Sequence, residues 1–147
     1  MPSENKTTER PVIGLALSGG SGRAIAHIGV LEVMREHKIP IDIITACSSG
    51  VIVAASYACS SLAELKKDWL TWDKRFIMNL LQLSDADAGI FAADKISNQF
   101  ERYFKGHRNF EEVSPRLGFV CVDINTGLPL TLSLGDMARA GRASCAV

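Results

Sequence analysis

Two short apolar runs constrain the fold of this chain more than any other feature. Residues 12–17 and 41–45 are nearly continuous apolar segments, which is typical of strands buried on both faces. Small residues end each run, and a helical pattern follows each of them, over 24–37 and 49–58. A strand–helix–strand order implies a right-handed crossover, so the two strands should be parallel neighbours. We therefore expect an α/β fold with a mainly parallel central sheet flanked by helices.

Patterns further along the chain extend this sheet. Residues 116–122 predict another strand, and 128–134 predict its hairpin partner across a turn at 123–127. Further helical patterns cover 62–72, 92–104 and 136–142, whereas 78–88 is ambiguous. Nothing divides the chain into repeats or linked parts. We expect a disordered tail at residues 1–10 and one domain over 11–147, which is long enough to bury a real core.

The composition excludes several classes of function. Basic and acidic residues number 16 each, and 47% of the residues are hydrophobic, as in ordinary globular proteins. Without a basic field, no nucleic-acid partner is expected. Residues 1–10 lack the apolar core of a secretory signal, and no apolar run could span a bilayer, so we expect a cytoplasmic protein with peripheral membrane contact left open. The four cysteines should be reduced, and their spacing from the three histidines predicts no metal site.

The turn after the second strand carries a candidate nucleophile, Ser48. The apolar run before it and the helical pattern after it are those of a nucleophile elbow, although Ala46 replaces the first glycine of G-x-S-x-G. The remaining elbow residues are Cys47, Ser49 and Gly50. A serine at this point lies at a helix N-terminus, which favours developing negative charge. The simpler alternative is a serine that only caps the helix.

The turn after the first strand is rich in glycine and could hold an anion. That anion would be either a nucleotide phosphate or the oxyanion formed when Ser48 attacks a carbonyl. The nucleotide alternative has little support, because G-x-x-x-x-G-K-[ST] is absent and G-x-G-x-x-G is only partly met. Both turns should open at the carboxyl edge of the sheet and face one crevice, which favours acyl transfer. Arg23 could steer an anionic head group or, as we prefer, brace the loop. We expect the oxyanion-hole residues to be Gly19, Gly20, Ser21 and Gly22.

Several motifs resemble those of patatin-like phospholipases. They are the stretch 17–31 with L-S-G-G-S-G-R-A and A-H-I-G-V-L, the elbow 46–50 preceded by 39–42, the D-I-N-T-G hairpin at 123–127, and R-A-S-C-A-V at 142–147. The resemblance covers about residues 12–147 in the family's order. It implies a three-layer sandwich and a serine–aspartate dyad that hydrolyses fatty acyl esters of lipids or phospholipids. It also implies that neither a histidine nor a cofactor takes part.

The chain departs from the family pattern in two ways. Ser21, Ala24 and Ala46 stand where glycine is usual, and their Cβ atoms could narrow or tilt the oxyanion hole. The family's dyad aspartate lies in a downstream D-G-[GA] motif, which does not occur here. We therefore expect a domain truncated at the C-terminus, without its base and with little or no turnover. An exposed sheet edge could then promote self-association.

The alternative function is a non-catalytic remnant of the same fold that binds a lipid or a partner.

Other residues receive structural interpretations. Asp123 should cap a turn rather than act as a base. His27 should pack or form a hydrogen bond, and His37 should be solvated near the end of its helix. His107 follows Ser48 in the chain and could pair with it, but its place in a polar loop does not favour this. The apolar residues between 69 and 81 form either an acyl-chain wall or, as we prefer, part of the core.

Overall fold

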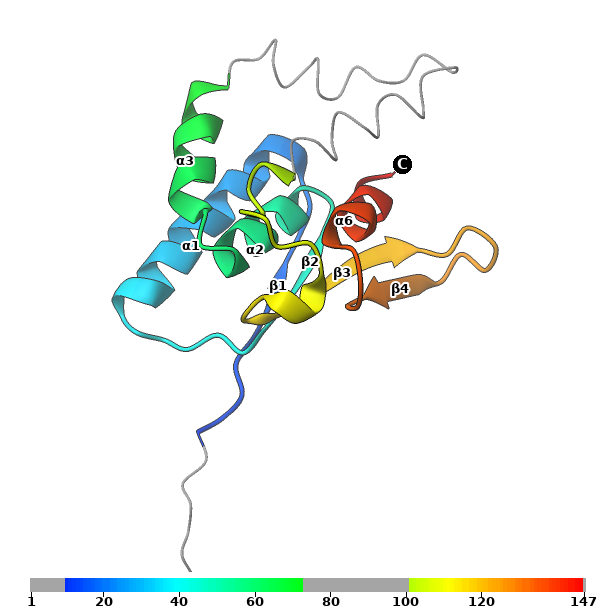
Figure 1. Cartoon of the computed structure of the whole chain (residues 1–147), viewed down its shortest axis with the longest axis horizontal. Coiled ribbons are helices and arrows are strands. Elements are labelled where there is room, and N and C mark those ends of the chain that lie inside the picture. Colours follow the sequence, from blue (N-terminus) through cyan, green and yellow to red (C-terminus); the bar gives the residue numbers. More distant parts are fainter. Residues whose placement is uncertain (1–9, 73–100, 147) are drawn as a thin grey trace, which may run out of the picture.

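The computed structural model describes residues 10–72 and 101–146. Its four strands form one sheet in the order β1-β2-β3-β4 (Figure 1). The strands are β1 (Gly14–Leu17), β2 (Ile43–Cys47), β3 (Arg116–Val122) and β4 (Pro129–Leu132). The first three strands are mutually parallel, and β4 returns antiparallel to β3. The predicted parallel pair and the predicted hairpin are both confirmed.

Helices connect these strands. They are the 3-10 helix η1 (Ser21–Ala24), α1 (Ile25–Glu36), α2 (Ser49–Ala58), α3 (Leu62–Thr71), the 3-10 helix η2 (Phe110–Glu112) and α6 (Met137–Cys145). The last helix runs beyond its predicted end at 142, and Asp136 caps it by accepting the Arg139 N–H at 2.9 Å. The ambiguous segment 78–88, and the predicted helix 92–104 up to residue 100, lie outside the described residues.

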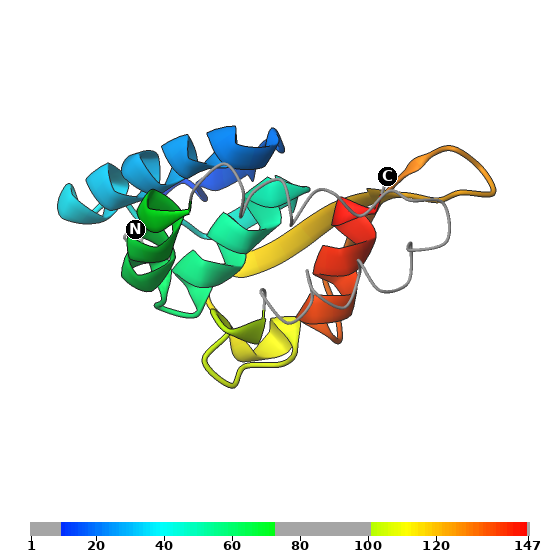
Figure 2. The ribbon, with the colours of Figure 1, turned by 90° about the horizontal axis from the view of Figure 1, so that it is seen from above.

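The helices pack on the sheet through α2 and α6. Helix α2 contacts β2 and β3, α6 contacts β3, and the two helices contact each other, so they share one face of the sheet (Figure 2). Helices α1 and α3 pack against α2 and against each other. The mainly parallel α/β sheet is thus as predicted. The third layer of a sandwich is not among the described residues.

Helix α2 lies at the centre of this packing. Every residue from Gly50 to Ser56 is buried, so the helix has no solvent face. Its glycine, alanine and valine side chains are small enough for strands and helices to approach from all sides. Trp69 is also buried, at 8% exposure, as expected for a core residue. Ser48 therefore lies directly before the first residue of the most buried helix described.

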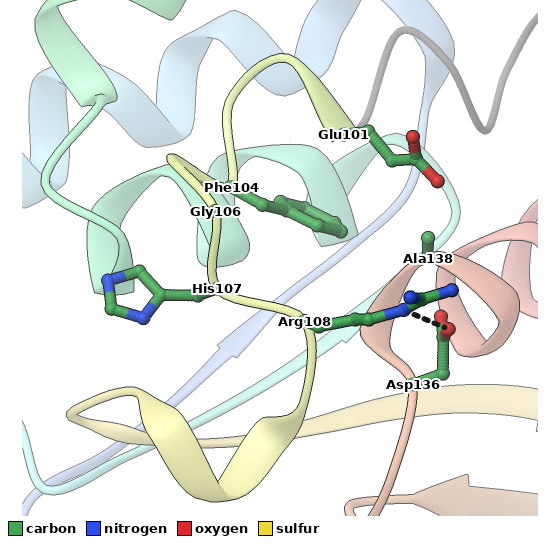
Figure 3. A pocket seen from close by; sticks show the side chains of 7 residues that line it. All are labelled: Glu101, Phe104, Gly106, His107, Arg108, Asp136 and Ala138. Atoms are coloured by element: carbon green, nitrogen blue, oxygen red, sulfur yellow. Dashed lines mark hydrogen bonds and ion pairs between the residues drawn. The ribbon is translucent and has the colours of Figure 1, made fainter.

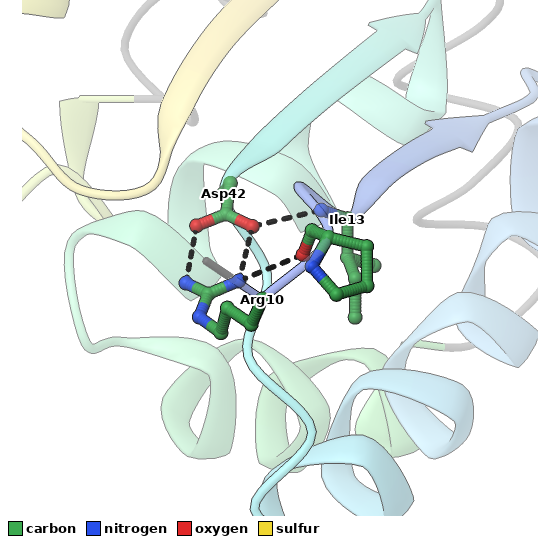
Figure 4. A network of polar contacts seen from close by, with 4 residues as sticks. Arg10, Ile13 and Asp42 are labelled. Carbon is green, nitrogen blue, oxygen red and sulfur yellow. Dashed lines mark hydrogen bonds and ion pairs between the residues drawn. The ribbon is translucent and has the colours of Figure 1, made fainter. Parts of the chain in front are cut away.

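A polar network ties the amino ends of β1 and β2 together (Figure 4). Asp42 accepts two hydrogen bonds from the Arg10 guanidinium, at 2.6 Å and 2.8 Å, and one from the Ile13 N–H at 2.8 Å. The hydrogen bond from Arg10, followed by that from Ile13, lowers the pKa of Asp42 to about 2. The tail predicted for 1–10 thus overlaps an ordered contact at its last residue. This network lies at the edge of the sheet opposite Ser48.

No helix within residues 10–72 and 101–146 is long and apolar enough to cross a membrane.

Candidate active site

Ser48 adopts a strained conformation between β2 and α2. Its φ of 51° and ψ of −128° lie in a region that costs an L-residue about 1–3 kcal/mol. The side chain makes no capping hydrogen bond to α2, so helix capping does not explain the serine. A strained serine on a sharp strand-to-helix turn is the arrangement of a nucleophile elbow.

The glycine loop packs directly against this serine. A Cβ added to Gly19 would lie 2.9 Å from the Ser48 Cβ and 3.5 Å from its Oγ. Only a residue without a side chain allows the two turns to come this close. The preceding strands pair Leu17 with Ala46, so both turns leave the same edge of the sheet. The structure therefore brings together the two turns that the sequence predicts to face one crevice.

Gly50 allows a second close approach at this edge. A Cβ on Gly50 would lie 2.7 Å from the Ser18 carbonyl oxygen and 2.8 Å from that of Leu17. The first turn of α2 thus abuts the end of β1. This contact places the N-terminus of α2 beside the glycine loop.

The glycine loop turns into η1 through two residues with positive φ. Gly20 has a φ of 133°, and Ser21 has a φ of 53°. A positive φ favours glycine, which is the residue that the motif pattern has at position 21. The Arg23 N–H donates to the Gly20 carbonyl at 3.1 Å and closes the turn. The Arg23 side chain is exposed, so its bracing role stays a prediction. Because η1 begins at Ser21, the first amides of this turn, which include that of Gly22, lack an intrahelical acceptor.

The two alanines that replace usual glycines are both buried. Ala24 is 1% exposed and Ala46 is 2% exposed, and both belong to the hydrophobic core. Their methyl groups therefore fill core space. The expected narrowing of the oxyanion hole at these two positions stays a prediction.

His27 holds the carbonyl of the loop's first residue. Its Nε2 lies 2.9 Å from the Ser18 oxygen, and because a carbonyl only accepts, Nε2 carries the proton. The Ser18 carbonyl and the Gly19 N–H belong to one peptide plane. The predicted hydrogen-bonding role of His27 is confirmed, and its consequence is to orient the amide of Gly19.

Helix α6 contributes two residues that sequence reasoning left without a role. The Ser48 N–H donates to the Ser144 Oγ at 2.9 Å, and the Ser144 hydroxyl donates to the Val120 carbonyl at 2.5 Å. Burial raises the pKa of the Cys145 thiol to about 11; the nearby Cys47 adds to the rise, and a side-chain hydrogen bond with Ser48 opposes it. The thiol beside Ser48 is therefore neutral at neutral pH and cannot serve as a general base.

No hydrogen bond within the described ranges joins a carboxylate or an imidazole to the Ser48 hydroxyl. Asp123 accepts the N–H groups of Asn125 at 2.8 Å and Thr126 at 3.2 Å, which confirms the predicted turn-capping role. Residues 10–72 and 101–146 contain no group of three or more histidine, cysteine, aspartate or glutamate residues that could hold a metal ion.

A cavity of about 310 Å³ lies at the other end of α6 (Figure 3). Arg108 and Asp136 form an ion pair at its wall, with Nε and Oδ2 3.5 Å apart. The backbone N–H of Arg139 is the main cause that lowers the pKa of Asp136. Ser144 lies eight residues further along the helix, or about 12 Å at 1.5 Å per residue. The cavity is therefore separate from the Ser48 turn.

Comparisons with known proteins agree with this geometry. A sequence model described as patatin-like phospholipase matches residues 15–147. An uncharacterised NTE family protein of Mycobacterium tuberculosis is 32% identical over 137 residues, which cover 93% of this chain and 38% of the relative. The neuropathy target esterase sws of Drosophila persimilis is 27% identical over 137 residues, 90% of this chain and 9% of that protein.

The fold is also that of a solved structure. The type III effector protein ExoU aligns with a TM-score of 0.60 at 14% identity, over 94% of this chain and 40% of that chain. The chain thus spans about two fifths of ExoU and of the mycobacterial relative. The family model covers nearly all of the sequence, including the glycine loop, the elbow and the segment around Ser144. By that match, and by the mycobacterial identity, this chain belongs to the patatin-like phospholipase family.

Proposed function

We propose that this chain carries the nucleophile of a serine acyl hydrolase that cleaves fatty acyl esters of lipids or phospholipids. The observation that carries the proposal is the strained Ser48 with the backbone of Gly19 against it. Ser48 Oγ attacks the ester carbonyl as a base takes its proton, and the amides of the glycine loop donate hydrogen bonds to the developing oxyanion. The alcohol then leaves with that proton, and water hydrolyses the acyl-enzyme to release the fatty acid. The family description and the esterase name of the Drosophila relative support an ester of this class as substrate.

The base of this reaction is the part that the described residues do not supply. The resemblance implies an aspartate, but the contact described at the Ser48 side chain is the neutral Cys145 thiol. A serine hydroxyl is a weak nucleophile until a base takes its proton. We therefore expect slow ester turnover by this chain on its own.

An activated probe tests the nucleophile directly. We expect a fluorophosphonate to label Ser48, as located by peptide mass spectrometry, and Ser48→Ala to abolish labelling. Ser56→Ala is the matched control, because Ser56 is fully buried in the same helix and its hydroxyl has no hydrogen-bond partner. Absence of label from the unmodified chain would contradict the proposed function. Fast Ser48-dependent hydrolysis of a p-nitrophenyl ester would support the function and refute the expected slow turnover.

A second function is a lipid-binding module that has lost the chemistry. It is favoured because no carboxylate or imidazole among the described residues is hydrogen-bonded to the Ser48 hydroxyl. Co-sedimentation with phosphatidylcholine vesicles, unchanged in Ser48→Ala and without probe labelling, is the result expected of such a module. Labelling without vesicle binding would exclude it.

Self-association is a further proposal about partners. Within the described residues, β4 is an edge strand, and its hairpin exposes Val122, Leu128 and Leu130 at 62%, 64% and 47%. An unpaired strand with apolar neighbours can pair with a second chain. Sedimentation velocity should show species larger than a monomer, and a single monomer peak at high concentration would contradict this.

A further inference from the structure

We propose that Ser144 is a positioning residue that clamps the strained Ser48 turn to strand β3. Its hydroxyl joins two parts of the chain that are far apart in sequence, at separations of 96 and 24 residues. Ser144 is buried, at 8% exposure, so its contacts are largely shielded from water. The value of this clamp for reactivity rests on the proposed function, but the clamp itself can be tested without it.

The Ser48 N–H needs a partner outside the regular elements. β2 ends at Cys47 and α2 begins at Ser49, and the positive φ of Ser48 turns its backbone away from both. A partly buried N–H without an acceptor is costly, and a strained conformation persists only when its surroundings over-determine it. The Ser144 Oγ, at 2.9 Å, provides the acceptor.

The direction of both hydrogen bonds follows from the donors and acceptors present. A hydroxyl has one proton and two acceptor lone pairs. The Val120 carbonyl can only accept, so the Ser144 proton points to it and a lone pair faces the Ser48 N–H. The result is one chain of bonds from Ser48 through Ser144 to Val120, in which each bond polarises the next. Alanine can supply neither bond, whereas threonine retains the hydroxyl.

The clamp also reaches the glycine loop. The Ser48 N–H shares its peptide plane with the Cys47 carbonyl, whose oxygen lies 3.3 Å from where a Cβ on Gly19 would be. Releasing the N–H would let this peptide rotate, and the carbonyl would then move against Gly19. Val120 pairs with Cys47 in the sheet. The clamp therefore fixes the Ser48 turn to β3, the strand that neighbours β2.

Amide hydrogen exchange followed by NMR tests the clamp. In the unmodified chain the Ser48 amide should be protected. Ser144→Ala should speed its exchange about tenfold, the factor for loss of one hydrogen bond, with Val53 in α2 unchanged. Ser144→Thr should restore protection, and Ser56→Ala should leave it unaltered. Unchanged exchange at Ser48 in Ser144→Ala would overturn the proposal, as would an unprotected Ser48 amide in the unmodified chain.

An isosteric pair covers the case in which Ser144→Ala fails to fold. Threonine and valine at 144 have the same shape and differ in the hydroxyl, so only Ser144→Val should expose the Ser48 amide. Equal protection in the two variants would overturn the clamp.

Fluorophosphonate labelling then asks whether the clamp matters for reactivity. We expect Ser144→Ala to be labelled at least tenfold more slowly than the unmodified chain, and Ser144→Thr to restore the rate. Urea unfolding of each variant must show that it is folded under the labelling conditions. Equal labelling rates would overturn the positioning role. If the unmodified chain is not labelled at all, the proposed function fails, while the exchange experiment still decides the clamp.

Discussion

Two glycine-to-alanine substitutions should have opposite effects on stability. Both Gly50 in α2 and Gly29 in α1 lie inside helices, where alanine is favoured over glycine by about 1 kcal/mol. A Cβ on Gly29 meets no atom within 4 Å, so Gly29→Ala should stabilise the chain by about that amount. At Gly50 the new Cβ would lie 2.7 Å from the Ser18 oxygen and 2.8 Å from the Leu17 oxygen.

The close contact outweighs the helical preference at Gly50. Ordinary van der Waals contact begins at 3.4 Å, so α2 and β1 must separate by about 0.7 Å against two backbone carbonyls. Overpacking of this kind costs about 1–3 kcal/mol. Because both variants gain the same helical preference, they should differ in stability by about 1–3 kcal/mol.

Urea unfolding followed by tryptophan fluorescence and circular dichroism measures this difference. Trp69 is buried and should report loss of the core. We expect a higher midpoint than the unmodified chain for Gly29→Ala and a lower one for Gly50→Ala, with slower fluorophosphonate labelling of the latter. If Gly50→Ala is as stable as Gly29→Ala, the close approach of α2 to β1 is not as described.

Three further expectations concern other parts of the described chain. Ser21→Gly removes a non-glycine residue at a φ of 53° and should stabilise the chain by about 1 kcal/mol in urea unfolding; a lower midpoint would contradict the strain. Asp42 has its pKa lowered from 3.8 to about 2 by Arg10, so its contribution is full above pH 3.8 and is lost as the pH falls through 2. Acid should therefore destabilise the unmodified chain more than Asp42→Asn, and equal slopes between pH 5 and 2 would refute this. Because burial raises the pKa of Cys145 to about 11, iodoacetamide at pH 8 should alkylate exposed Cys47 first, and equal rates by mass spectrometry would argue against that burial.

The sheet and the meeting of the two turns could be predicted because they depend on local patterns. Each apolar run is followed by its own turn and helix, and chirality then places the strands side by side. The register that pairs Leu17 with Ala46 brings both turns to one edge. The serine and the glycine loop carry their signals within a few residues, so sequence reasoning could find them.

Element boundaries depend on contacts that the local pattern does not contain. The apolar pattern predicts a first strand from residue 12, but the strand begins at Gly14, because the Ile13 N–H donates to the Asp42 carboxylate and not to a backbone carbonyl of a neighbouring strand. β4 likewise covers Pro129–Leu132 within the predicted 128–134. The clamp at Ser144 is further from prediction still, since its partners lie 96 and 24 residues away.

The structure also separates glycine positions that look alike in sequence. Glycine is required at Gly19 and Gly50 by contact, because a Cβ at either position would lie within 3 Å of an atom in a neighbouring turn. At position 21 glycine would be preferred because of the positive φ of 53°, so a serine there costs strain. Position 46 needs neither the close approach nor the positive φ that glycine permits, since Ala46 lies in a regular strand with its methyl group in the core. The missing first glycine of the elbow is therefore compatible with the close packing of Gly19 on Ser48, on which the proposed chemistry depends.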